Sequence, residues 1–293
     1  MKKLIATTFL IAVGFFTARG QSVQPDQSLL NRRYREGETL IYHMKGVNEN
    51  WHYQAQATGI VKKDSAGYFE EYGWSKFVSD GKEVTLPPAS AGFRQQLTLD
   101  PNHNPSFPNL AQVDSMMIGP ITDLLTFYAD VWLAIKTRKV KQAGDHFYFK
   151  RPGPNSWADG NYVLLGEDTV DFDITLKGVD QSDHTVVLIV RHVPPESPQI
   201  KLPAAWMQER VADTANNWVQ VNKLPGGKYL AAVGKEFFDV EVKLSQINGV
   251  ILSATMDNRV ITVERECEDA ALTKCGGPKP HPIRRQIEIA LER

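Results

Sequence analysis

The residues best placed for ligand recognition are Arg191 and His192, which follow the most apolar stretch of the predicted strands. Residues 186–190 are apolar without a break, so the strand that they predict is covered on both faces, with the apolar helix described below as one cover. A charge at the end of such a strand must be paired or lie at the mouth of a cavity. Arg191 and His192 are therefore candidates to orient a ligand. The alternative is that the strand simply emerges into water at this point.

Two tryptophans are further candidates for a ligand surface. Trp157 lies in the connector formed by residues 151–160, and a loop tryptophan can bind sugars or peptides. The favoured alternative is that Trp157 packs back onto the sheet. Trp132, in the apolar helix described below, is assigned to the same possible ligand surface.

Residue patterns for catalysis or metal binding are weak. Asp171 and Asp173 have the spacing of a carboxylate pair on one strand face, but a solvated face carries charges at the same positions. The seven histidines are scattered, without the spacing of metal ligands. We therefore predict no catalytic residue, no metal site and no cofactor. Only a His146 or His192 within hydrogen-bond reach of a buried carboxylate in a cleft would favour an enzyme.

The two cysteines predict a local disulfide. Cys267 and Cys275 are eight positions apart, whereas redox-active pairs typically have the tighter Cys-x-x-Cys spacing. A disulfide also suits an exported chain. In the chain-entropy model so short a loop contributes about 2–3 kcal/mol.

The first twenty residues have the build of a secretory signal. Two lysines precede an apolar run over residues 4–16, and small residues follow at Ala18 and Gly20. Cleavage after Gly20 is expected. The predicted product is a soluble protein without a transmembrane anchor, in a periplasm or outside the cell.

The charge balance argues against a nucleic-acid partner. Residues 1–20 carry three of the 33 lysines and arginines, so 30 basic residues remain against 34 acidic ones, a net charge of −4. There is no basic tract, and a nucleic-acid binder needs one.

Apolar residues alternate with polar ones through most of the chain. This pattern predicts strands over residues 51–61, 68–78, 170–177 and 238–256, the last with a hairpin turn at Asn248-Gly249. The first two strands exceed the usual strand length of about five or six residues. Strands of that length typically form a curved sheet or barrel.

One segment has a helical period instead. Apolar residues recur at spacings of three and four between Met117 and Ile135, and Gly119-Pro120 is a plausible start for a helix ending near Lys136. This helix is apolar on more than one side, so other elements must pack against most of its surface. We predict a mainly β fold in which a large, half-barrel-like antiparallel sheet covers one long apolar helix. A helix lying in a membrane interface is the alternative.

The domain organisation follows from these patterns. Residues 1–20 form the signal peptide, residues 21–35 a flexible arm, and residues 36–293 a single mainly β domain.

A short resemblance supports this architecture. The sequence Arg-Glu-Gly-Glu-Thr-Leu-Ile-Tyr at 35–42 and the small residues at 55–59 resemble exported bacterial families of unknown function whose fold is similar to the lipoprotein-carrier half-barrel. The resemblance covers about 25 residues and implies a curved sheet around a helix and an apolar cavity. It carries over no functional residue.

The leading expectation is a non-enzymatic exported protein that binds an apolar or lipid-like ligand in the concavity of the sheet. A structural or protein-interaction module of the cell envelope is the alternative, using a sheet edge or the Trp157 loop to bind an envelope protein. A hydrolase acting on an envelope polymer ranks third.

Overall fold

The computed structural model describes residues 29–292 except 107, 153–156, 159–161, 166–168, 194–203, 214–215 and 217. Of residues 150–152, 157–158, 162–165, 169–171 and 192–193 only the backbone is described. The predicted signal peptide and residues 21–28 of the predicted arm lie outside the described residues.

Most described residues belong to strands of one antiparallel sheet. The strands are β1 (Thr39–Asn48), β2 (Trp51–Lys63), β3 (Tyr68–Ser79), β4 (Lys82–Glu83), β5 (Arg94–Leu97), β6 (His146–Pro152), β7 (Trp157–Ala158), β8 (Tyr162–Leu165), β9 (Thr169–Asp180), β10 (Thr185–Val193), β11 (Trp218–Lys223), β12 (Tyr229–Ser245), β13 (Ile251–Cys267), β14 (Lys279–Pro280) and β15 (Ile283–Leu291).

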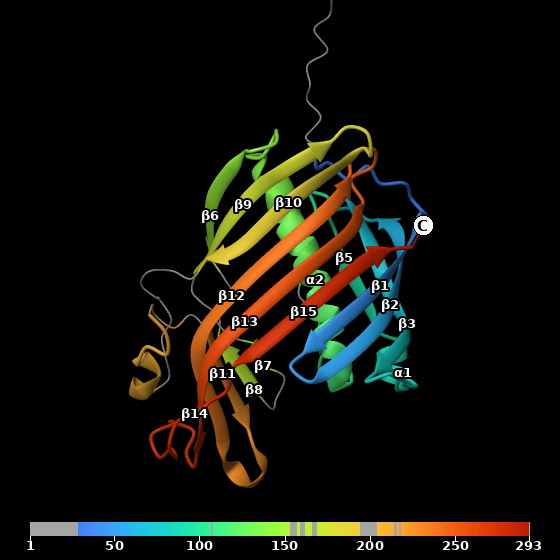
Figure 1. Cartoon of the computed structure of the whole chain (residues 1–293). Coiled ribbons are helices and arrows are strands. Elements are labelled where there is room, and N and C mark those ends of the chain that lie inside the picture. The colour runs from blue at the N-terminus through green and yellow to red at the C-terminus, as the bar shows by residue number, and fades with distance from the viewer. Residues whose placement is uncertain are drawn as a thin grey trace, which may run out of the picture.

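The sheet brings the two ends of the described chain together. Its main strand order is β4-β3-β2-β1-β15-β13-β12-β10-β9-β6, so the first strand pairs with the last. Figure 1 shows β1 and β15 side by side near the middle of the sheet. The remaining strands extend this path, with β11 on β12, β8 on β11, β7 on β8, β14 on β13 and β5 on β3. Strands from both halves of the chain therefore build one sheet.

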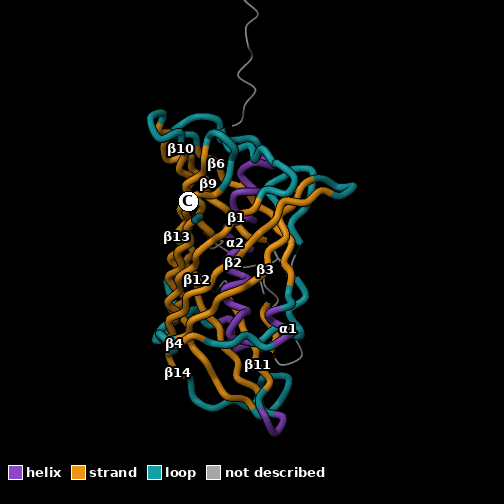
Figure 2. Tube along the Cα trace, turned by 90° about the vertical axis from the view of Figure 1, so that its right-hand side faces the viewer, coloured by secondary structure: helices purple, strands orange, loops and turns teal. Residues whose placement is uncertain are grey.

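Helix α2 (Ser115–Thr137) lies against one face of this sheet, which we call the inner face. Figure 2 shows the strands bending around α2. The helix is long and apolar enough to cross a membrane, yet 67% of its most apolar window is buried inside the fold. This confirms the predicted fold class, a large curved antiparallel sheet around one long apolar helix. The second helix, α1 (Pro88–Ala91), is a single turn.

The start of α2 differs from the prediction. The helix begins at Ser115, and Pro120 lies inside it. The N-cap is Asp114, whose carboxylate accepts a hydrogen bond from the backbone N–H of Met116 at 3.0 Å. A cap of this kind satisfies an N–H group that has no partner within the helix. The capping aspartate was therefore a better start signal than the proline.

The apolar strand 186–190 is central in the sheet, between β9 and β12, but only one of its faces is covered. Val186, Leu188 and Val190 are fully buried in the main core, whereas Val187 and Ile189 are half-buried on the outer face. The prediction of cover on both faces was therefore wrong, because β-branched residues also suit a half-exposed sheet surface.

The strands β12 and β13 serve two cores on opposite faces of the sheet. Val240 and Val242 belong to the main core, whereas Ala231 and Val233 belong to a small second core. These pairs differ in parity along a strand with regular register, so they point to opposite faces. The small core also contains Met207 of the 3₁₀ turn Ala205–Gln208. The predicted disulfide between Cys267 and Cys275 is present beside it.

Residues 29–35, predicted as part of a flexible arm, are docked against the sheet. Leu30 is fully buried, and the N–H of Arg33 donates to the carbonyl oxygen of Asn248 at 2.8 Å. Gly249 of the β12–β13 turn permits this approach, because a Cβ there would collide with the backbone of Asn31 and Arg32. Order therefore begins earlier than the polar composition suggested.

Candidate functional site

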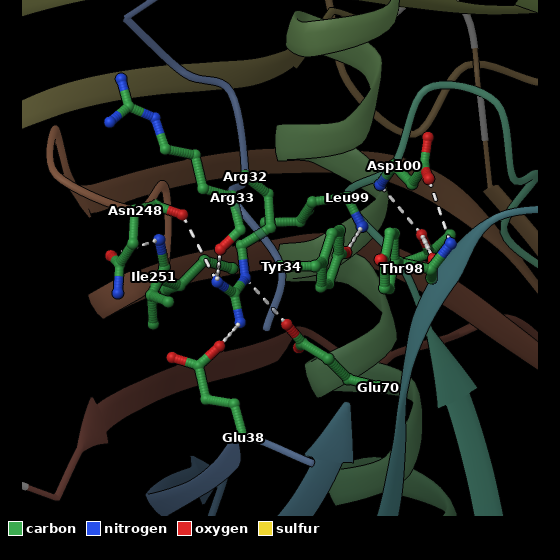
Figure 3. Close-up of polar contacts among 12 residues, drawn as sticks. Arg32, Arg33, Tyr34, Glu38, Glu70, Thr98, Leu99, Asp100, Asn248 and Ile251 are labelled. Carbon is green, nitrogen blue, oxygen red and sulfur yellow. Dashed lines mark hydrogen bonds and ion pairs between the residues drawn. The ribbon is translucent and has the colours of Figure 1, made fainter. Parts of the chain in front are cut away.

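A buried ion pair ties the start of the described chain to strand β3. Arg32 donates from Nε to Glu70 at 3.1 Å and from a terminal nitrogen to Glu38 at 2.7 Å. A second terminal nitrogen donates to the backbone oxygens of Arg33 and Asn248. Figure 3 shows the guanidinium of Arg32 between Glu38, Glu70 and Asn248. The Arg32 and Glu70 side chains have almost no exposed surface.

Tyrosines complete this first network around Glu70. The hydroxyls of Tyr72 and Tyr128 both donate to its second oxygen, Tyr72 at 3.0 Å. Nearby, the Tyr42 hydroxyl donates to the carbonyl oxygen of Ile251 at 2.7 Å. Burial raises the pKa of Glu70, although the charge of Arg32 and the tyrosine hydroxyls oppose the shift.

The Arg32–Glu70 network is a structural element and not a reaction centre. Both Glu70 oxygens are engaged, and its partners are fully buried, so no substrate can reach them. When all the hydrogen bonds of a buried ion pair are made, they offset the free energy of its desolvation. Loss of one partner would leave an uncompensated buried charge and would be strongly destabilising. The network fastens the N-terminal segment, β3 and α2 to one another.

A second network joins α2 to β15 and β2. Arg285 donates to one oxygen of Asp123, and the Tyr53 hydroxyl donates to the other at 2.9 Å. Burial raises the pKa of Asp123, against the opposing charge of Arg285. Burial alone would lower the pKa of Arg285, but the charge of Asp123 raises it. Unlike Arg32, Arg285 keeps 25% of its side chain exposed.

The exposed part of Arg285 faces a cleft of about 580 Å³ beside the N-terminal half of α2. Strands β1, β2, β11, β12, β13 and β15 contribute residues of their inner face to the cleft. Its larger apolar side chains are Trp51, Ile118, Trp218, Val260 and Ile283, and polar side chains include Thr122, Gln220, Glu236, Asn258 and Arg285. Its volume and mixed lining are typical of a small-molecule site.

The two tryptophans of the cleft come from different parts of the sheet. Trp51, at the start of β2, donates from its indole nitrogen to Ser79 at 2.8 Å and packs against Tyr53 in a tilted arrangement, with ring centroids 5.1 Å apart. Gly119 of α2 faces it, and a Cβ there would stand 3.9 Å from the indole ring, in ordinary van der Waals contact. Trp218 begins β11 and is half-buried. Between them, the amide of Asn258 donates to Glu236 at 2.7 Å.

The residues predicted to bind a ligand do not meet in this cleft. Arg191 is exposed on the outer face, where its Nε donates to Asp239 at 2.8 Å. Trp132 is buried, and its indole nitrogen donates to the carbonyl oxygens of Asp100 and His103 at 3.1 and 3.0 Å. Trp132 therefore holds a loop onto α2. His192 and Trp157 lie in β10 and β7, but their side chains lie outside the described residues.

An enzyme would be favoured by a histidine close to a buried carboxylate in a cleft. The structure shows a close pair of a histidine and a carboxylate, but not in the cleft. His146 Nε2 lies 2.6 Å from Asp173, whose side chain is 14% exposed. Both residues lie on the outer face, on the edge strand β6 and its neighbour β9, away from the concave cleft. In the described part of the chain no three histidines, cysteines or carboxylates are grouped to hold a metal ion.

Sequence reasoning missed Arg285, Trp51 and Trp218 as site residues, although a signal for Arg285 was present. Arg285 falls between Ile283 and Ile287, at a position that the alternation of β15 assigns to the core face. An arginine there requires a buried partner. The lone acid Asp123 in an apolar helix was the matching signal, but the distance of 162 residues between them hid the pairing.

Known proteins give no direct assignment for the cleft. No family model, no curated protein and no solved structure matches the chain. The function argued below therefore depends on the geometry of the described residues.

Proposed function

We propose that the protein is an exported, non-catalytic binding protein that holds a small molecule in the concave cleft. The observation that carries this proposal is Arg285. Its guanidinium has five N–H donors, and the hydrogen bond to Asp123 leaves others directed to a cleft with tryptophans in its lining. A cationic group fixed by Asp123 and Tyr53 beside aromatic side chains is preorganised to position a ligand.

A ligand that is only apolar, as the sequence suggested, suits this cleft poorly. An acyl chain over Arg285, Gln220 and Asn258 would remove water from these groups without replacing its hydrogen bonds, which costs free energy. The interior between α2 and the sheet is occupied by the main core. The proposed ligand therefore has both an apolar surface and hydrogen-bonding groups.

Export of the protein remains part of the proposal. Its supports are the signal-like residues 1–20 and the Cys267–Cys275 disulfide, which suits a periplasm or the cell exterior. The bent sheet around α2 also agrees with the resemblance to the lipoprotein-carrier half-barrel. Fold likeness alone does not assign a function.

Native mass spectrometry of the full chain purified from its own cells tests the proposal. The wild type should retain a small-molecule adduct. Gln220→Trp, which fills the cleft from β11, should lose it. Gln54→Trp is the matched control, because Gln54 is an exposed strand glutamine on the outer face. An adduct of equal occupancy in Gln220→Trp, or no adduct in any of the three proteins, would refute the proposal.

A protein-interaction role is the second candidate, favoured by one observation. Tyr148 on the edge strand β6 is 68% exposed, and its ring packs edge-on against His146. Exposed aromatic side chains are enriched where partners bind. Cross-linking in envelope extracts should recover a partner with wild type and lose it with Tyr148→Ser. Recovery that is unchanged in Tyr148→Ser would rule this surface out.

A further inference from the structure

We infer that the ligand of the concave cleft is an uncharged glycan segment, bound through Trp51, Trp218 and the polar groups between them. This inference rests on the proposed function, because it names the chemistry of the ligand that the cleft would hold. Three features of the lining lead to it: the aromatic side chains, the mixed hydrogen-bonding groups and the charge balance.

The aromatic side chains suit sugar rings. A pyranose has a face of C–H groups that packs on an indole ring, while its hydroxyls point outward in the ring plane. Trp51 is held by Ser79 and Tyr53 and is fixed in place before a ligand binds, and the backbone of Trp218 is held in β11 by its pairing with Gly234 of β12. Aromatic rings of this kind supply contact area at low cost in conformational entropy.

The polar side chains offer both donors and acceptors, as a hydroxyl-rich ligand requires. Arg285 contributes N–H donors, and Thr122 contributes a hydroxyl whose proton is already given to backbone oxygens of α2. The amide nitrogen of Gln220 donates to Asn222 at 3.1 Å, which orients its oxygen as an acceptor. A sugar hydroxyl can donate and accept at once, so it matches either kind of group.

The charge balance disfavours ionic ligands. Asp123 offsets the charge of Arg285, and the carboxylates of Glu49 and Glu236 also line the cleft. An anionic headgroup or a fatty-acid carboxylate would enter beside these two acids, and like charges repel strongly where water is partly excluded. A cation would find these two acids already engaged, Glu236 by Asn258 and Glu49 by His281 at 3.3 Å. A neutral ligand avoids both penalties.

Calorimetric titration of the full chain tests this inference with four named probes. They are the trimer of N-acetylglucosamine, maltotriose, palmitate and phosphocholine. At least one of the two trisaccharides should bind, and its binding should shift the indole N–H resonances of Trp51 and Trp218 in NMR spectra. Trp218→Ala should weaken binding roughly tenfold, since a stacked aromatic contact contributes on that order.

The control is Tyr148→Ala, which removes an exposed aromatic side chain from an edge strand away from the cleft and should leave affinity unchanged. Thermal unfolding of each variant verifies that it is folded. Binding of palmitate or phosphocholine alone at the cleft would overturn the glycan inference and leave the proposed function standing. If none of the probes binds but the native protein retains another adduct, only the glycan inference fails. Absence of that adduct as well removes the proposed function.

Discussion

The ring of Tyr72 occupies the space above Gly59 on the neighbouring strand, so that a Cβ at Gly59 would collide with it. The two residues are direct cross-strand partners, and the glycine lets the Tyr72 hydroxyl reach Glu70. Gly46 and Tyr53 repeat the arrangement beside Asp123. A glycine within a strand often marks such a close approach.

Gly59→Ala should therefore destabilise the protein by about 1–3 kcal/mol, the usual cost of an overpacked core. Urea unfolding measures the change. The control is Gly178→Ala in β9, where a Cβ would meet no atom within 4 Å. An equal loss of stability in both variants would show that the ring of Tyr72 is not the cause.

Removal of Arg32 should be among the most destabilising single changes to the fold. Arg32→Met leaves Glu70 buried without its cation, and broken buried pairs cost about 3–5 kcal/mol. Arg32→Met/Glu70→Gln should recover part of this loss, because no unpaired charge remains. Chemical denaturation compares the variants. Lys177→Ala, which breaks an exposed pair with Glu241, should change the free energy of unfolding little, and a comparable loss there would contradict the explanation.

The stability of the protein should fall as the pH rises above the ordinary carboxyl range. Burial raises the pKa of Glu70 above the usual 4.5, so the folded state keeps a proton that the unfolded state has released. Because the folded state then binds more protons, the free energy of unfolding decreases with increasing pH in this range. Glu70→Gln should show a flatter dependence above pH 4.5. A steeper dependence in the variant would refute this assignment.

Reduction of the disulfide should loosen the small core before the large one. Cys267 is fully buried beside Leu272, and the indole of Trp206 donates to the Leu272 carbonyl oxygen at 3.0 Å. Dithiothreitol, or Cys267→Ala/Cys275→Ala, should lower stability by about 2–3 kcal/mol. In a variant that keeps Trp206 as its single tryptophan, the fluorescence reports on the small core. Its unfolding midpoint should come at a lower denaturant concentration than the midpoint measured by far-ultraviolet circular dichroism. Coincident transitions would show that the two cores unfold together.

Processing of the chain gives a prediction from the sequence alone. The mature protein isolated from cells should begin at Gln21, because Ala18 and Gly20 form the predicted cleavage site. Intact mass and N-terminal sequencing measure this directly. Gly20→Arg should impair cleavage and leave a longer chain, whereas Gln24→Arg should be processed normally. A full-length wild type would refute the signal assignment.

The sequence predicted the sheet well because its strands obey simple local rules. Period-two alternation located β2, β3 and the parts of β12 and β13 next to their turn, which Asn248-Gly249 marked. The helix was found from its period, but its start was misjudged, since a proline can lie inside a helix after the first turns and Asp114 was not considered as a cap.

The candidate site was not predictable in the same way, because its residues meet only through long-range pairing. Arg285 reaches Asp123 across 162 positions, and Arg32 reaches Glu70 across 38. The register between β1 and β15 that sets the first of these contacts has no local signal. Arg191 was a candidate because it follows an apolar run, which is visible in the sequence, whereas its exposure on the outer face is not.

The pairing of β1 with β15 constrains when the protein can fold. The middle of the sheet is built from the earliest and the latest strands to be synthesised, so the concavity around α2 cannot close until Leu291 has been made. Sheets with such distant pairings fold slowly. A newly made chain therefore lacks its central contacts throughout its synthesis and becomes compact only once its last strand is free.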